Sequence, residues 1–355
     1  MPLNHLLIFT PGFPSSEHET TCLPAVQQFV KCYRETYPEL IISVISLHYP
    51  FTTTGYKWNN VDVYPTNGRN KTGIKRGITI LKAIRKARQI NKDKNVDAVL
   101  CFWLTDAALA GKRFANKTNI PYLAWMHGQD ARPGNKYVKL VHPLKHQLAA
   151  ISQFQQQIFE KTYPYQTGHI ISNGITQTLF PELNISSRSI DLLAVGSLIP
   201  LKQYHLFIEL VNELKNKGHK NINAVLAGEG ILFDELGELI AKLKLENNIR
   251  ITNKISHNAV LQLMNDARVF VHTSAYEGHS TVMLEALYSG CKVVSFIPAS
   301  DDVIPNSIVC NDMDTIIETC SNLLSKQEQP SRILVNSIKD SVTTVHNILN
   351  VKKSR

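Results

Sequence analysis

The sequence alternates short apolar runs with longer segments of helical periodicity, and it does so twice. In the first half, apolar runs at residues 5–9, 41–47 and 98–102 are separated by segments with helical spacing at 23–37 and 74–90. Strands of this length that alternate with helices are typical of βαβ units, whose strands form a parallel sheet covered by helices. The alternation predicts an α/β fold.

The same alternation begins again after a polar, turn-rich stretch at residues 176–189. Predicted strands and helices then follow in turn at 192–195, 204–217, 223–226, 233–245, 249–251, 258–267, 269–272, 280–289 and 292–296. A chain of 355 residues also exceeds what one core usually organises. We therefore expect two doubly wound, Rossmann-like α/β domains that face each other across a cleft, at residues 1–184 and 185–335. Residues 336–355 are expected to form a closing helix that packs back on the first domain.

Composition narrows the functional classes. The chain is 43% hydrophobic, and no apolar run approaches the roughly 20 residues that a transmembrane helix requires. The apolar stretch after Met1 continues into a turn, as in a first strand, so we expect a cytoplasmic protein. The net charge of +9 suits an anionic partner, but no aromatic residues are interleaved with the basic ones, so we expect no nucleic-acid partner. We expect no metal and no other cofactor, because no cluster of carboxylates and histidines has the spacing of metal ligands.

The most informative stretch runs from a predicted strand into a loop and a new helix. Gly278 allows the backbone to approach a ligand closely, and Ser280 or Thr281 caps a helix whose free N–H groups suit a phosphate. Glu277 in the loop and Glu285 in the helix can both point into one pocket and accept hydrogen bonds from sugar hydroxyls. The alternative is that Glu277 is a solvated loop residue and Glu285 only favours the helix N-terminus.

Two further turns follow predicted strands in the second half. Gly196 and Ser197 begin a turn that leads to Lys202 just before a helix, where an ammonium group can hold a diphosphate. Taken alone, this lysine is more simply interpreted as a surface residue at a helix start. Gly228 and Gly230 form a Gly-x-Gly turn after the next strand, which by itself is weak evidence for a ligand.

In the first half, a predicted strand at 122–125 leads into His127, Gly128 and Asp130. A single histidine at a strand end is more often structural than catalytic. Gly12 lies in the loop after the first predicted strand, and such loops border the ligand in doubly wound domains.

In this order, the motifs resemble those of the family 4 retaining glycosyltransferases, which belong to the glycosyl transferases group 1 and have the GT-B fold. Glu277-Gly278 and Glu285-Ala286 match the E-G-x6-E-A signature of that family, and Gly290 matches the small residue that follows. The resemblance implies retaining, metal-independent transfer of a sugar from a nucleoside diphosphate sugar, with UDP- or GDP-sugars favoured. It implies a saccharide or lipid-linked acceptor and a role in surface polysaccharide or glycolipid synthesis.

The resemblance also implies roles for single residues. Glu277 contacts hydroxyls of the donor sugar, Glu285 contacts the ribose, Lys202 holds the diphosphate and His127 lies beside the sugar, so His127, Glu277 and Lys202 are the expected catalytic residues. The other expected donor-binding residues are Gly196, Ser197, Gly228, Gly230, Gly278, His279, Ser280 and Thr281. Gly12 and Asp130 are expected on the acceptor side, and Asp130 has the alternative role of orienting its loop.

Two departures from the family pattern leave alternatives open. Ser197 stands where the family has the arginine of its diphosphate clamp, and the loop after Gly12 lacks the paired glycine that many members have. One alternative is an NDP-sugar epimerase with the same fold, which turns over the donor without an acceptor. The other is a catalytically inactive subunit that binds a nucleotide sugar.

A basic segment lies between the second and third predicted strands. Its cationic residues are Lys75, Arg76, Lys82, Arg85, Lys86 and Arg88. Because Ile74, Ile78, Leu81 and Ile84 recur at helical spacing, we expect an ordinary helix that packs these four residues on the core. The alternative is a basic face, from Lys75 to Arg88, that contacts an anionic membrane, which would place the protein peripherally at the inner face of the cell membrane.

Overall fold

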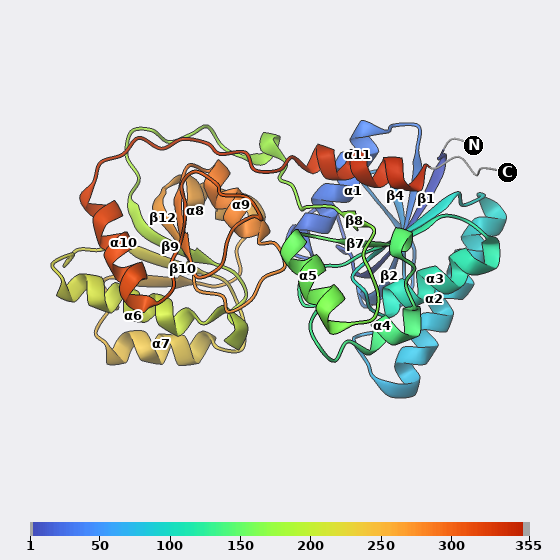
Figure 1. Cartoon of the computed structure of the whole chain (residues 1–355), viewed down its shortest axis with the longest axis horizontal. Coiled ribbons are helices and arrows are strands. Elements are labelled where there is room, and N and C mark those ends of the chain that lie inside the picture. Colours follow the sequence, from blue (N-terminus) through green and yellow to red (C-terminus); the bar gives the residue numbers. More distant parts are fainter. Residues whose placement is uncertain (1–2, 351–355) are drawn as a thin grey trace. The chain divides into compact units, whose positions relative to one another are not determined.

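The computed structural model describes residues 3–350 and divides into two compact units (Figure 1). Among the described residues, unit 1 is formed by residues 3–174 together with 337–350, and unit 2 by Ile175–Asn336. The last part of the predicted closing helix, residues 351–355, lies outside the described residues. Between residues 3 and 350, none of the helices has both the length and the apolar character needed to cross a membrane.

Within the described residues, unit 1 contains an eight-stranded sheet with the order β3-β4-β2-β1-β5-β6-β7-β8. The strands are β1 (His5–Gly12), β2 (Ile41–Tyr49), β3 (Tyr56–Trp58), β4 (Val61–Pro65), β5 (Ala98–Phe102), β6 (Tyr122–Trp125), β7 (Leu148–Ala150) and β8 (His169–Ile170). β3 is antiparallel to β4, and the other neighbouring strands are parallel. The order reverses at β1, so the loops after β1 and β5 lie at the topological switch point, where doubly wound domains bind ligands.

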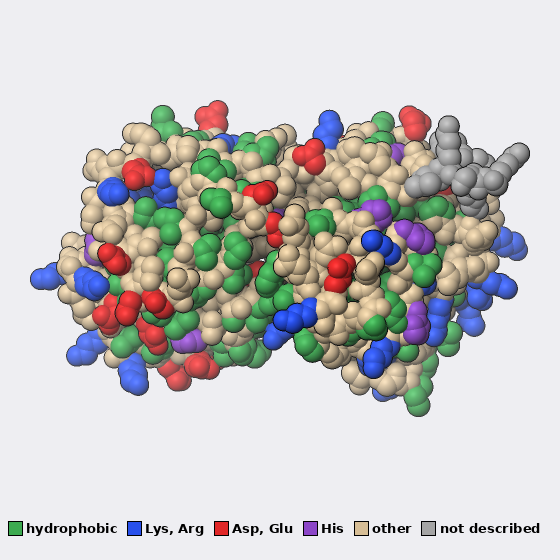
Figure 2. Space-filling model, viewed as in Figure 1, with side chains coloured by type: hydrophobic (Ala, Val, Ile, Leu, Met, Phe, Trp, Pro, Cys, Tyr) green, Lys and Arg blue, Asp and Glu red, His purple; other side chains and the backbone are tan. Residues whose placement is uncertain are grey.

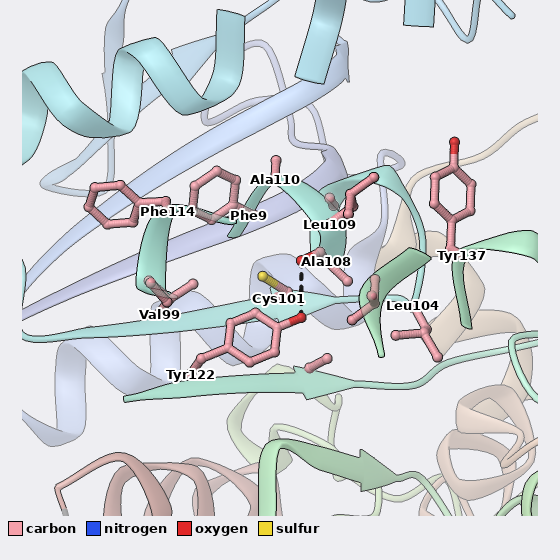
Figure 3. Packing of buried hydrophobic residues seen from close by; sticks show 14 of the residues in the cluster. Phe9, Val99, Cys101, Leu104, Ala108, Leu109, Ala110, Phe114, Tyr122 and Tyr137 are labelled. Atoms are coloured by element: carbon pink, nitrogen blue, oxygen red, sulfur yellow. Dashed lines mark hydrogen bonds between the residues drawn. The ribbon is translucent and has the colours of Figure 1, made fainter. Parts of the chain in front are cut away.

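Helices cover both faces of this sheet. They are α1 (Pro24–Thr36), α2 (Gly73–Asp93), α3 (Asp106–Thr118), α4 (Lys136–Val141), α5 (Gln153–Thr162) and α11 (Ile338–Leu349). One core cluster joins the sheet to α1 and α11, and the other joins it to α2, α3, α4 and α5. Figure 3 shows the second cluster, in which the Tyr122 hydroxyl donates a hydrogen bond to the Ala108 carbonyl oxygen at 3.0 Å. Because Gly111 has no side chain, α3 packs closely against Cys101 of β5.

Unit 2 contains a six-stranded sheet, within the described residues, with the order β11-β10-β9-β12-β13-β14 and parallel pairing throughout. The strands are β9 (Ile190–Val195), β10 (Ala224–Ala227), β11 (Ile249–Thr252), β12 (Ala267–His272), β13 (Lys292–Ser295) and β14 (Ser307–Val309). The helices are α6 (Tyr204–Asn216), α7 (Phe233–Lys242), α8 (His257–Asn265), α9 (Thr281–Tyr288) and α10 (Met313–Ser325). α6, α7 and α10 cover one face, and α8 and α9 cover the other. Both units are thus doubly wound α/β sheets, which confirms the predicted fold class.

The boundary between the units differs from the predicted one. The sequence suggested a boundary at residues 184 and 185, whereas unit 2 begins at Ile175. Leu179 and Phe180 pack on the core of unit 2, and the Asn184 backbone N–H donates to the Asn265 side chain at 3.1 Å, so this turn-rich stretch is part of unit 2. At the other end, α11 begins at Ile338 and packs on α1.

The orientation of α2 also differs from the prediction. Ile74, Ile78 and Leu81, which were expected to face the core, are 85%, 48% and 63% exposed, and of the four only Ile84 is buried. The buried face consists of Thr79, Ile80, Ala83, Ile84, Ala87 and Ile90. The segment carries two apolar stripes, and the prediction selected the one that faces solvent.

Candidate functional site

In unit 2, two loops meet at the switch point of the sheet. β9 and β12 are adjacent strands, and the strand order reverses at β9. The loop after β12 is fastened to the turn before α6, because the Ala275 N–H donates to the Leu201 carbonyl at 3.0 Å and the Thr273 hydroxyl to the Lys202 carbonyl at 2.7 Å. These bonds bring Lys202 next to Glu277, although 74 residues lie between them in the chain.

Lys202, Glu277 and His272 form a charged cluster at this point. The Lys202 ammonium makes an ion pair with Glu277 Oε1, and His272 Nε2 lies 3.4 Å from the same oxygen. The side chains of Lys202 and Glu277 are only 17% and 19% exposed, so Glu277 is not a solvated loop residue. Burial raises the pKa of the Glu277 carboxyl, but His272 and the Lys202 charge outweigh burial and lower this pKa to about 2. The cluster therefore holds an ionised carboxylate and an ammonium group side by side at the carboxyl edge of the sheet.

A second pair lies at the adjoining helix starts. His257, the first residue of α8, places Nε2 2.7 Å from Oε1 of Glu285 in α9. Burial lowers the His257 pKa, but the hydrogen bond and the charge of Glu285 outweigh burial and raise it. Both side chains are largely buried. Glu285 is therefore held by a histidine of the neighbouring helix α8.

The glycines of the turns are required by the packing of the loops on each other. A Cβ atom on Gly228 would overlap the carbonyl oxygen of Gly196, and one on Gly230 would overlap that of Leu198. Gly196 itself has a φ angle of +153°, which disfavours other residues, and a Cβ there would lie 2.6 Å from the Tyr204 hydroxyl. The turns after β9 and β10 therefore fit together only because their glycines lack side chains.

The remaining predicted donor residues surround the start of α9. Gly278 and Ser280 are buried, and His279 and Thr281 are partly buried. Ser280 occupies the N-cap position, but its side chain makes no capping hydrogen bond to α9, contrary to the expectation that it caps the helix. Ser197 is exposed at the surface of the turn after β9.

In unit 1, His127 lies in an aromatic surround after β6. Its ring centroid is 4.7 Å from that of Trp125, 4.9 Å from Trp103 and 5.5 Å from Phe102. The Trp103 N–H donates to the Trp125 carbonyl at 2.9 Å, which joins the ends of β5 and β6. The histidine is 6% exposed at the carboxyl edge of the sheet.

Asp130 joins the same two loops. Its Oδ2 atom accepts hydrogen bonds from the backbone N–H groups of Leu104 at 2.7 Å and His127 at 3.0 Å. Burial raises the pKa of this carboxyl to about 7, against the opposing effect of the two hydrogen bonds. Asp130 thus holds the His127 loop on the loop after β5, in the manner of a positioning residue.

Gly12 ends β1, and the polar loop that follows is held down at several points. Glu19 accepts hydrogen bonds from the Ser15 N–H at 2.7 Å and the Tyr49 hydroxyl at 2.9 Å. Glu17 accepts one from the Asn59 N–H at 2.7 Å. The acidic residues of this loop therefore order the loop itself.

The side-chain contacts of three residues of unit 2 were missed by sequence reasoning. His272 ends the buried strand β12 at its carboxyl edge, and a polar residue in that place was a usable signal. His257 has no such signal, because its contact depends on how α8 packs beside α9. Tyr204 is fully buried beside Gly196, and in the described part of the chain its hydroxyl has no hydrogen-bond partner.

Comparisons with known proteins agree with this arrangement. A model of the family described as glycosyl transferases group 1 matches residues 176–337. The GPI3 subunit of the phosphatidylinositol N-acetylglucosaminyltransferase of Saccharomyces cerevisiae is 21% identical over 175 residues, which cover 47% of this chain and 38% of that protein. The N-acetylgalactosamine-N,N'-diacetylbacillosaminyl-diphospho-undecaprenol 4-alpha-N-acetylgalactosaminyltransferase of Campylobacter jejuni is 34% identical over 103 residues, 29% of this chain and 27% of that protein. The matches span less than half of the length of either relative.

The fold has a close parallel among solved structures. HepE of Anabaena, crystallised with UDP and glucose, aligns with 99% of this chain and 100% of its own length at a TM-score of 0.65 and 15% identity. At that identity the likeness shows the fold alone. Residues 176–337 therefore match the glycosyl transferases group 1 family, and the chain has the GT-B fold.

Proposed function

We propose that this chain is a retaining glycosyltransferase of family 4 that transfers a sugar from a nucleoside diphosphate sugar to a saccharide or lipid-linked acceptor. The observation that carries the proposal is the pairing of Lys202 with Glu277 on the two loops of the unit 2 switch point. An ammonium group at that place suits the diphosphate of a nucleotide sugar, and a carboxylate suits its sugar hydroxyls.

In this proposal, different residues of unit 2 contact the diphosphate, the sugar and the ribose of the donor. Lys202 and the N-terminus of α9 stabilise the negative charge that develops on the leaving diphosphate. Glu277, already ionised, orients the sugar through its hydroxyls, and Glu285, held by His257, takes the ribose. The bond from the anomeric carbon to the diphosphate breaks, a bond to the acceptor oxygen forms on the same face, and the acceptor proton leaves with the diphosphate. No step assigned to these residues calls for a metal ion.

The comparisons support a UDP-sugar as the first donor to test. HepE was crystallised with UDP and glucose, and the yeast and Campylobacter relatives are named for the transfer of N-acetylhexosamines. Their names also contain lipid acceptors, a phosphatidylinositol and a diphospho-undecaprenol. We therefore place the activity in surface polysaccharide or glycolipid synthesis, and we include peripheral membrane contact through the Lys75–Arg88 segment in the proposal.

The test is a transfer assay with UDP-N-acetylglucosamine and a set of short lipid-linked and free saccharide acceptors. We expect release of UDP that depends on the acceptor, and a product whose anomeric proton coupling in NMR matches that of the α-linked donor. Glu277→Gln keeps the shape of the side chain and removes its charge, so it should lower turnover by about 100-fold or more. Inversion of the anomeric centre would contradict the retaining mechanism.

The same assay separates the two alternatives. An epimerase would change the sugar of the donor with no acceptor present. An inactive binding subunit would bind UDP and release none from the UDP-sugar. The exposed Ser197, in place of an arginine, is the observation that favours the second alternative.

A further inference from the structure

The surface of α2 carries an unusual combination of side chains. Ile74, Ile78 and Leu81 are spaced four and three residues apart, so they form one stripe on the helix, and all three are exposed. Ile74 has 85% of its surface open to solvent, and Leu81 has 63%. Scattered single apolar residues are normal on protein surfaces, but three large aliphatic ones in a stripe mark an interaction surface.

Basic residues continue this stripe and border it. Arg85 and Arg88 follow Leu81 at spacings of four and three residues and are exposed, and exposed Lys75 and Lys82 lie on its flank. Asp93, the last residue of α2, is its only acidic residue. In Figure 2, Lys and Arg side chains lie beside hydrophobic ones on the part of unit 1 where α2 runs in Figure 1. The exposed face is therefore apolar at its beginning and cationic along the rest of its length.

The orientation of this face is fixed from inside the unit. Arg76 points inward, and its Nη1 lies 3.4 Å from Oδ2 of the buried Asp106. The same Asp106 oxygen is 2.9 Å from His48 Nε2. Arg76 Nε also donates to the Lys71 carbonyl at 2.8 Å, which fastens the first turn of α2. The stripe cannot turn towards the core while these contacts hold.

Further along α2, Lys86 is likewise turned away from the exposed face. Its ammonium lies 5.5 Å from the centre of the Tyr64 ring and donates to the Gln89 side chain at 3.0 Å. The exposed cations of α2 that are available to a partner are therefore Lys75, Lys82, Arg85, Arg88 and Lys92.

We propose that this face, defined by Ile74, Ile78, Leu81, Arg85 and Arg88, docks unit 1 on the surface of an anionic lipid bilayer. Aliphatic side chains can enter the boundary between headgroups and acyl chains while the cations contact lipid phosphates. Charge complementarity selects this partner, because a helix whose only carboxylate is its last residue suits a surface of fixed negative charge. The inference deepens the proposed function, since it names the surface through which a lipid-linked acceptor would be reached.

The test is co-sedimentation of the full chain with vesicles, without any donor or acceptor. One set contains equal parts of phosphatidylglycerol and phosphatidylcholine, and the other contains phosphatidylcholine alone. We expect binding to the anionic vesicles only, weakened as sodium chloride rises from about 0.05 M to about 0.5 M, where exposed charges are screened. Equal binding to both sets, or binding to neither, would overturn the proposal.

Two variants separate the apolar and cationic contributions. Ile78→Ser with Leu81→Ser should weaken binding to anionic vesicles at least about tenfold, because binding scales with the apolar area that enters the lipid. Arg85→Glu with Arg88→Glu should weaken it at least about 30-fold, given about 1 kcal/mol for each cation near such a surface. The matched control, Ile185→Ser with Leu334→Ser, removes exposed aliphatic side chains of unit 2 and should bind as the wild type does.

A second copy of the chain is the competing occupant of the stripe, and sedimentation of lipid-free protein tests for it. If a second copy covers the stripe, the protein will sediment as a dimer and Ile78→Ser with Leu81→Ser will make it monomeric, which would overturn membrane docking. A monomer in both cases is the expected result.

The docking face and the donor site can fail independently. The thermal shift that UDP-sugars cause reports on the donor site, to which the exposed face of α2 is assigned no contact. Vesicle binding without any UDP-sugar shift would therefore contradict the proposed function and leave the docking face intact. A UDP-sugar shift without vesicle binding would overturn the docking face and leave the proposed transfer reaction intact.

Discussion

The carboxyl group of Asp130 shows how a residue can matter without touching a substrate. It accepts two backbone hydrogen bonds in a buried position, and burial raises its pKa from 3.8 to about 7. In that range the folded chain retains a proton that the unfolded chain has lost. The free energy of unfolding should therefore fall as the pH rises from about 4 to about 7.

This behaviour gives a prediction at residue scale. Asp130→Asn keeps an oxygen for both N–H donors and has no charge to bury, so it should remove this pH dependence and be at least as stable as the wild type at pH 7. Asp130→Ala leaves two buried N–H groups without acceptors and should cost about 2–4 kcal/mol. Urea unfolding at a series of pH values measures both. If the two variants have equal stability, the positioning role is wrong.

His257 gives a prediction of the same kind with a different window. Its pKa is raised by Glu285 above the usual 6.5, so the folded chain holds a proton that the unfolded chain loses above that pH. The stabilisation is complete below pH 6.5 and is lost as the pH rises through the raised pKa. His257→Gln, which remains a neutral donor, should lack this loss. The difference in unfolding free energy between wild type and variant, followed from pH 6 to pH 9, measures it, and a constant difference would contradict the pairing.

The site could be predicted from the sequence as residue types in loops, but the contacts could not. Lys202 and Glu277 were both expected near one diphosphate sugar, because each follows a strand of the same sheet. That Glu277 also has His272 as a neighbour follows only from the path of the loop after β12, which returns the carboxylate towards its own strand. The Tyr204 hydroxyl is buried because Gly196 packs closely against it, and it has no hydrogen-bond partner among residues 3–350. This packing could not be predicted from the sequence.

Among the elements, the fit of the turns after β9 and β10 can be tested by adding one methyl group. Gly228→Ala would place a Cβ against the Gly196 carbonyl, so it should destabilise the protein by about 1–3 kcal/mol and weaken UDP-sugar binding. Gly237 lies exposed within α7 with nothing near its missing Cβ. Gly237→Ala should therefore stabilise the helix by up to about 1 kcal/mol. Denaturant unfolding measures the change in the free energy of unfolding for both variants. Equal changes would rule out the proposed packing of the two turns.

The helix α2 shows where element prediction from sequence fails. Its sequence has one apolar stripe through Ile74, Ile78 and Leu81 and another through Ile80, Ala83, Ile84 and Ala87. Both have helical spacing, so periodicity identified the helix but not the face it buries. The contact of Arg76 with Asp106 decides between them, and that contact depends on the packing of α2 against α3.

At the scale of the whole molecule, the double alternation of strands and helices predicted two doubly wound units, because parallel sheets need a crossover between successive strands. The short strands β3, β7, β8 and β14 were not predicted, since runs of two or three residues carry no periodicity. The helix α10 was missed as well, although it buries Ile316 and Cys320 in the core of unit 2. The boundary at Ile175 was not predicted either, because the residues after it have the composition of a linker. Only their tertiary contacts make them part of unit 2.

The central claim is that unit 2 holds a nucleotide sugar at the Lys202, Glu277 and Glu285 positions. A ligand that binds only the folded state stabilises the protein by mass action, by about 2.7 kcal/mol at 100 times its dissociation constant. The most direct measurement is the thermal unfolding midpoint with UDP-, GDP- and ADP-sugars, for the wild type, Glu285→Ala and the control Glu318→Ala on the exposed side of α10. We predict that one nucleotide, UDP in the first place, raises the midpoint of the wild type and the control by several degrees and leaves Glu285→Ala nearly unchanged. No shift with any nucleotide, or an equal shift in all three proteins, would contradict the account.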